Sequence, residues 1–82
     1  MSTPIHAMES FEARYLSISS NEISYTDAYS ATINLDRGRG GELIGIEFLT
    51  RPSNADSAEL ISRLRLPDQV SFELKALVPK VI

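Results

Sequence analysis

The chain has 82 residues, of which 43% are hydrophobic, and it carries a formal net charge of -3. This length predicts one domain, 1–82, without room for a deep cleft between two lobes. Cysteine is absent and His6 is the one histidine, which excludes a disulfide scaffold, a cysteine nucleophile and a histidine-rich metal site.

Acidic and basic residues are divided unevenly between the two halves of the chain. Residues 1–36 hold one basic residue against five acidic ones, and residues 37–82 hold seven against six. A nucleic-acid-binding domain usually shows a basic stripe, so this balance argues against a nucleic-acid partner. No apolar run reaches the roughly 18 residues of a membrane span, and residues 1–4 lack the features of a signal peptide. We therefore expect a cytoplasmic protein that has no contact with a membrane.

Apolar and polar residues alternate in four short runs between residues 14 and 50, which is the period of a strand with one buried face. The apolar members, in chain order, are Leu16 and Ile18; Ile23 and Tyr25; Ala31, Ile33 and Leu35; and Ile44, Ile46 and Phe48. The segments between the runs contain Ser, Asn, Asp or Gly, which favour turns. Because short connections place consecutive antiparallel strands side by side, we predict a four-stranded antiparallel β-meander over 14–50.

The pairing register follows from the need to keep apolar side chains on one face. In the last two runs, this requirement is met when Ile33 lies opposite Ile46. In the first two runs, the apolar side chains share one face when Leu16 lies opposite Tyr25, and this pairing places Tyr25 in the core. The sequence therefore predicts a sheet with one apolar face that needs a cover.

Residues 56–65 have the pattern of an amphipathic helix that supplies this cover. Asp56 is followed three positions later by Glu59, which is close to a capping box. Leu60, Ile61 and Leu64 then fall at helical spacing. Since Pro67 cannot continue a helix, the element ends before it. The predicted class is therefore α+β, with the helix lying on one face of the sheet.

The C-terminal element, 68–82, fits two descriptions. The alternation of Val70, Phe72 and Leu74 with polar residues is typical of a strand. A helical stripe is formed by Val70, Leu74, Leu77 and Val78. We favour the helix because good helix formers dominate the segment. Its apolar residues exceed what one sheet and one helix need, so they either fold back over the sheet or bury against another copy.

Residues 43–49, Leu-Ile-Gly-Ile-Glu-Phe-Leu, resemble the closing strand of a small bacterial family catalogued as domain of unknown function 2283. Residues 8–16 resemble its first part, and residues 31–36 resemble its strand that ends in an acid before a turn. The similarity covers Met8 to Leu49, and the Gly-Ile-Glu hairpin at 31–49 is its specific part. It implies the same antiparallel fold and assigns no catalytic residue.

The turn at residues 37–41 departs from that family, because it is basic where the family has an acidic turn with one glycine. A ligand preference tied to the acidic turn therefore does not carry over. Some members of the family look as though they are encoded beside small toxins. The resemblance thus implies an antitoxin-like role as one option.

Three carboxylates, those of Asp27, Asp36 and Glu47, are the ones that could cluster on the sheet. In the predicted register Asp36 and Glu47 lie more than about 10 Å apart, which is too far for a shared proton or a tight metal site. We expect Glu47 to form a cross-strand pair that keeps the polar face soluble. The sequence therefore predicts no enzyme, no catalytic residue, no metal and no cofactor.

The segment Arg37-Gly38-Arg39-Gly40-Gly41 allows a functional interpretation as well as a structural one. It precedes a strand and has no lysine, so it is not a P-loop. As a nucleic-acid contact it would act through Arg37, Arg39 and Arg51, although a single Arg-Gly copy is a weak signal. As a hairpin turn, its glycines supply positive φ angles, and this is the interpretation that we favour.

Exposed tyrosines and the apolar C-terminal element are the candidates for an interface. The residues are Tyr15, Tyr29, Phe72, Leu77 and Val78. Tyrosine is enriched at protein interfaces, and small domains gain stability from a two-fold contact with a second copy. We predict a small non-enzymatic protein-interaction module that forms a homodimer. The alternatives are an antitoxin-like or host-factor-binding protein, and a weak nucleic-acid binder that uses the Arg37–Gly41 turn.

Overall fold

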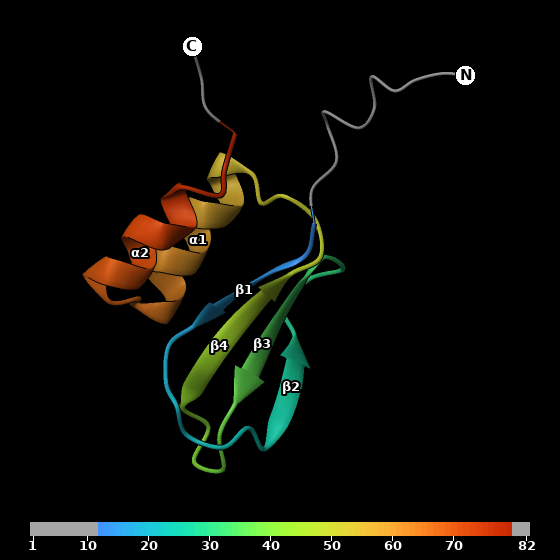
Figure 1. The fold of residues 1–82 in the computed structure, drawn as a ribbon, viewed down its shortest axis with the longest axis vertical. Coiled ribbons are helices and arrows are strands. Elements are labelled where there is room, and N and C mark those ends of the chain that lie inside the picture. The colour runs from blue at the N-terminus through green and yellow to red at the C-terminus, as the bar shows by residue number, and fades with distance from the viewer. Residues whose placement is uncertain (1–11, 80–82) are drawn as a thin grey trace.

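The computed structural model describes residues 12–79, which form a four-stranded antiparallel sheet and two helices (Figure 1). The elements are β1 Arg14–Ser17, β2 Tyr25–Ala28, β3 Ile33–Arg37, β4 Leu43–Phe48, α1 Asn54–Leu64 and α2 Asp68–Lys75. The predicted α+β class is confirmed. His6 and the last residues of the predicted C-terminal element, 80–82, lie outside the described residues.

The strand order is β1-β4-β3-β2, so the predicted meander order is wrong. β1 pairs with β4 rather than with β2, and residues 18–24 carry the chain across the end of the β3–β4 hairpin (Figure 1). Along this crossing the amide of Ile18 donates to the carbonyl of Ile44 at 2.8 Å, and the amide of Ser24 donates to that of Arg37 at 2.7 Å. The most apolar strand, β4, thereby gains a neighbour on each side.

The register of β3 and β4 is shifted by two residues from the prediction, since Ile33 lies opposite Phe48 and Leu35 lies opposite Ile46. The predicted pairing of Ile33 with Ile46 is therefore wrong. A shift of two residues keeps Ile33, Leu35, Ile46 and Phe48 on their predicted face, because the side-chain period of a strand is two. At the end next to the turn, Leu43 and not Ile44 lies opposite Arg37 and packs against the core. The cause lies in the turn, where the pairing becomes irregular at Asp36 and Arg37 and Gly41 takes a positive φ of 85°.

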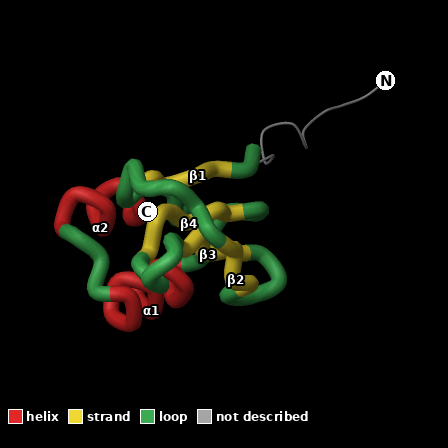
Figure 2. The backbone as a smooth tube through the Cα atoms, turned by 90° about the horizontal axis from the view of Figure 1, so that it is seen from below, coloured by secondary structure: helices red, strands yellow, loops and turns green. Residues whose placement is uncertain are grey.

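The core lies between the sheet and the two helices, which sit on one face of the sheet, α2 beside β1 and α1 toward β2 (Figure 2). Its buried members are Leu16, Ile33, Leu35, Ile46, Phe48, Leu60, Leu66, Val70 and Leu74. Tyr25, predicted to be buried, is 46% exposed. The reason is its place on β2, an edge strand that packs, among the described elements, against β3 alone.

α1 begins two residues before the predicted start, because Ser53 and not Asp56 caps it. The Ser53 hydroxyl accepts a hydrogen bond from the Asp56 amide at 3.0 Å, and the Asp56 carboxylate accepts one from the Ser53 amide at 3.1 Å. This is a complete capping box with the aspartate in the position usual for glutamate. The helix ends at Leu64, and Arg65 follows it with a left-handed φ of 51°.

α2 confirms the helical interpretation of the C-terminal element and folds back onto the sheet. Val70 and Leu74 are buried in the core, and Leu77 packs against it. Phe72, on the opposite side of the helix, is 71% exposed. Among residues 12–79, no helix has both the length and the apolar character needed to cross a bilayer.

The docking of α2 can be tested with two substitutions on the same helix. Leu74→Ala should lower the free energy of unfolding by about 2–5 kcal/mol, because it leaves a cavity in the core. Phe72→Ala, the matched control, should change it by less than about 0.5 kcal/mol, because this side chain lies in water. Urea denaturation monitored by circular dichroism measures both values, and equal losses for the two variants would contradict the observed packing.

Candidate functional site

Polar side chains gather on the face of the sheet that points away from the helices, here called the polar face. The strand register places them in two rows that run across the sheet. One row contains Tyr15, Glu47, Asn34 and Ala28, and the next contains Ser17, Gly45, Asp36 and Thr26. Because they share one face, the side chains within each row and between the rows lie within reach of one another.

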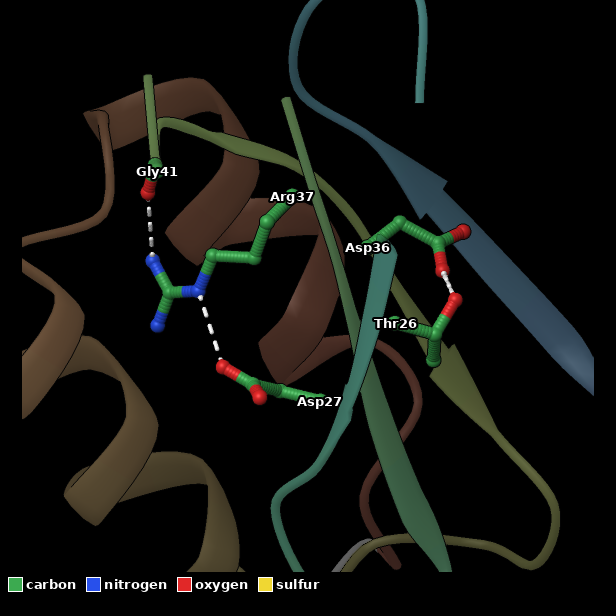
Figure 3. Close-up of polar contacts among 5 residues, drawn as sticks. All are labelled: Thr26, Asp27, Asp36, Arg37 and Gly41. Atoms are coloured by element: carbon green, nitrogen blue, oxygen red, sulfur yellow. Dashed lines mark hydrogen bonds and ion pairs between the residues drawn. The ribbon is translucent and has the colours of Figure 1, made fainter. Parts of the chain in front are cut away.

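Asp36 is the centre of the polar face. One of its carboxylate oxygens accepts a hydrogen bond from the Thr26 hydroxyl at 2.6 Å, as Figure 3 shows. The other oxygen accepts a hydrogen bond from the Tyr15 hydroxyl at 3.0 Å. Thr26 belongs to β2 and Tyr15 to β1, so this one carboxylate is bonded to both edge strands of the sheet.

Gly45 makes the hydrogen bond from Tyr15 to Asp36 possible. It lies on β4 between Tyr15 on β1 and Asp36 on β3, and the Tyr15 ring passes over it. A Cβ at position 45 would overlap the Tyr15 ring and hydroxyl. Glycine inside a strand often marks a close approach of this kind. The absent side chain of Gly45 is therefore a condition for the hydrogen bond between Tyr15 and Asp36.

Glu47 forms a cross-strand pair, in which its carboxylate accepts a hydrogen bond from the Asn34 side-chain amide at 3.1 Å. The shifted register makes Glu47 a diagonal neighbour of Asp36, at a spacing of about 7–8 Å, which is closer than the sequence predicted. Both carboxylates are already bonded to other side chains. Within residues 12–79, no three His, Cys, Asp or Glu side chains come together in a group that could hold a metal ion.

Two tyrosines have a raised pKa. For Tyr15, burial is the largest cause, followed by the hydrogen bond to Asp36 and by the charges of Asp36 and Glu47. For Tyr29, burial again comes first, and the Glu59 carboxylate raises the pKa further. Both environments therefore favour the neutral phenol, which in Tyr15 acts as a hydrogen-bond donor.

Arg37 holds the turn at residues 38–42 against β2. Its guanidinium lies 3.4 Å from the Asp27 carboxylate and donates to the Gly41 carbonyl at 3.1 Å. In Figure 3 these contacts lie on the side of the β2–β3 pair opposite to Thr26 and Asp36. Only 23% of the Arg37 side chain is exposed. The geometry gives Arg37 a structural role in the turn.

The three arginines considered for nucleic-acid contact lie in different surroundings. Arg39 is exposed in the same turn as Arg37. It borders an open depression of 480 Å³ that is also lined by Asn21, Glu22, Ile23, Ser24 and Glu42. Arg51 follows β4 at its other end and donates to the Leu77 carbonyl at 3.1 Å. The fold therefore does not bring Arg51 to the turn.

The residues predicted for an interface do not form one surface. Tyr15 is 45% exposed on the polar face, whereas Phe72 lies on α2, beyond the opposite face. Leu77 and Val78 are half-buried. Tyr29, expected to be exposed, is also half-buried, and its hydroxyl is buried without a hydrogen-bond partner among the described residues.

Sequence reasoning missed the parts of the polar face that depend on the strand order. Thr26, Asn34 and Gly45 were assigned no role, although the alternation places them on the outer face. The available signal was Gly45, a glycine in the middle of an apolar strand, which suggests a close approach by another group. Ile23 is 48% exposed, so its predicted place on the buried apolar face is wrong, because its segment crosses the end of the hairpin and does not pair with β1. Leu49, which is 44% exposed, was given no role.

Comparison of the chain with protein-family models, with curated proteins and with solved structures found no match in any of the three. The resemblance of Met8 to Leu49 to domain of unknown function 2283 gains no support from these comparisons and stays a prediction.

The contact across Gly45 can be tested with a double-mutant cycle. Gly45→Ala should cost about 1–3 kcal/mol of unfolding free energy, because the new methyl group overlaps the Tyr15 ring. In a Tyr15→Ala background the same substitution should cost much less, since the overlapping ring is gone. Urea denaturation of the four proteins gives the coupling energy, and additive losses would contradict the close approach.

The tyrosine environment predicts a pH dependence. Since the folded pKa of Tyr15 is raised, its neutral form stabilises the fold below its ordinary pKa of about 10, and this contribution is lost as pH rises through the folded pKa. Asp36→Asn should lower the pKa of Tyr15 toward its ordinary value, because the carboxylate charge is removed. An absorbance titration in a Tyr25→Phe, Tyr29→Phe background isolates Tyr15. An unchanged titration after Asp36→Asn would refute the role of that charge.

Proposed function

We propose that this protein is a non-catalytic protein-interaction module that associates with a second copy of itself. The observation that carries the proposal is the exposure of five large hydrophobic side chains although the core is already closed. They are Tyr15, Ile23, Tyr25, Leu49 and Phe72, with exposed fractions between 44% and 71%. A cytoplasmic location is part of the proposal.

The polar face supports the non-catalytic part of the proposal. Both oxygens of Asp36 accept hydrogen bonds from hydroxyl groups of the protein itself, and Glu47 accepts one from Asn34. General acid-base catalysis requires a group that can reach the proton that it transfers. These carboxylates instead tie neighbouring strands together, which is a structural role.

The apolar surface supports the interaction part. α2 contributes Val70 and Leu74 to the protein's own core, so between residues 68 and 79 Phe72 is the large hydrophobic side chain that stays exposed. Ile23 and Tyr25 remain exposed at the β2 edge of the sheet. Aromatic side chains of this kind are enriched at the centres of protein interfaces. A protein partner therefore suits this surface better than a small substrate.

Nucleic acid is the less favoured partner. Arg37 is occupied by Asp27 and by the Gly41 carbonyl, so a phosphate would have to displace an existing ion pair. Arg51 lies at the other end of β4. The turn thus offers Arg39 as an exposed cation in a chain of net charge -3.

Self-association can be measured directly by sedimentation equilibrium over a wide concentration range. The proposal predicts that the average mass rises from the chain mass of 9.1 kDa toward twice that value as the concentration increases. The interaction should be weak, because the contact between two copies would bury less accessible surface than the roughly 1,200 Å² that stable protein–protein interfaces bury. A mass that stays at 9.1 kDa up to millimolar concentration would refute it.

A further inference from the structure

β2 is the open edge of the sheet. All four of its residues are exposed, and among the described elements it packs against β3 alone. The other edge strand, β1, lies against α2. Figure 1 shows β2 at the lower right of the sheet with both helices at the upper left, and Figure 2 shows α1 on the helix face at the level of β2. A second sheet would therefore approach this edge in the plane of the sheet.

The backbone of β2 presents unused hydrogen-bonding groups along this edge. The amide of Tyr29 donates to the carbonyl of Ile33 at 2.9 Å, so in the antiparallel ladder the odd-numbered residues of β2 bond to β3. The amide and carbonyl groups of Thr26 and Ala28 therefore point away from the sheet. A row of this kind is a template for the addition of another strand.

β2 is short, at four residues, but other devices that usually protect an exposed edge are missing or neutralised here. Proline and lysine do not occur in β2, and the pairing irregularity lies between β3 and β4. Asp27 is the one charged residue of β2, and the Arg37 guanidinium lies 3.4 Å from it. Ile23 and Tyr25 are exposed beside the edge and add apolar surface to it.

We infer that the β2 edge is the self-association surface and pairs antiparallel with β2 of a second copy, which joins two sheets into one. This inference rests on the proposed function and specifies its partner surface. A two-fold axis makes the contact the same for both subunits. Both polar faces then lie on one side of the joined sheet, and all four helices lie on the other.

Charge excludes one register of this pairing, and the inferred register is the neighbouring one. If Asp27 lay on the two-fold axis, it would face Asp27 of the partner subunit, and like charges directly opposite each other are destabilising. A shift by one residue pair places Thr26 on the axis, with Tyr25 opposite Asp27 of the partner subunit. In this register, Ser24 lies opposite Ala28 of the partner subunit, and no two like charges face each other.

The absence of cysteine from the chain allows a clean cross-linking test. In the inferred register, the two copies of residue 26 lie about 5.5 Å apart between Cα atoms, within the range of a disulfide bond. Thr26→Cys should therefore give a disulfide-linked dimer as the main product of mild oxidation, seen by non-reducing electrophoresis. Two further single-cysteine variants serve as controls, and circular dichroism verifies that each variant is folded.

The first control is Ser17→Cys, which occupies the same row of the polar face at the β1 edge and should remain monomeric. The second is Ala28→Cys, because the two copies of residue 28 would lie about 14 Å apart at four residues along the strand. Cross-linking of Ala28→Cys in place of Thr26→Cys would overturn the register. Cross-linking of Ser17→Cys alone would overturn the choice of edge.

A proline variant supplies a test that does not depend on a disulfide. Ala28→Pro removes an amide that points to the open edge and keeps the ladder to β3, so the domain should fold and its dimer should be lost. A dimer that persists in Ala28→Pro would overturn the β2 interface and leave the proposed function standing. A wild-type chain that stays monomeric, with no Thr26→Cys product, would refute both.

Discussion

The fold depends on one constraint, which is that β4 must have a strand on each side. β4 carries the apolar residues Ile46 and Phe48 on one face and Gly45 and Glu47 on the other. With β1 and β3 as its neighbours, both apolar side chains become fully buried. The crossing at residues 18–24 follows from this arrangement, because it must carry the chain from one edge of the sheet to the other.

The same constraint produces the polar face and leaves the β2 edge open. Because β1 lies next to β4, Tyr15 can reach over Gly45 and bond to Asp36 on β3. Asp36 also accepts a hydrogen bond from the Thr26 hydroxyl on β2. One carboxylate is thus hydrogen-bonded to both edge strands. The carboxylate is thereby committed to structure, and what remains available for function is the surface around β2 and α2.

The sequence predicted the faces of the strands but not their order. Ile33, Leu35, Ile46 and Phe48 were assigned to the core correctly, because alternation alone determines which residues share a face. The order failed because consecutive strands are usually neighbours, and nothing in residues 18–24 marks a crossing. The pairing of Tyr15 with Asp36 depends on that order, so the centre of the candidate site could not be found from the residues alone.

Residue-level amide hydrogen exchange, measured by NMR at several protein concentrations, tests most directly the claim that β4 is central and that β2 is the open, associating edge. We predict that β4 amides exchange slowly at every concentration, and that the amides of Thr26 and Ala28 become protected only as the concentration rises. The amide of Ser17 on β1 should not respond to concentration. Exchange at Thr26 and Ala28 that is independent of concentration, or β4 amides that exchange as fast as those of an edge strand, would contradict it.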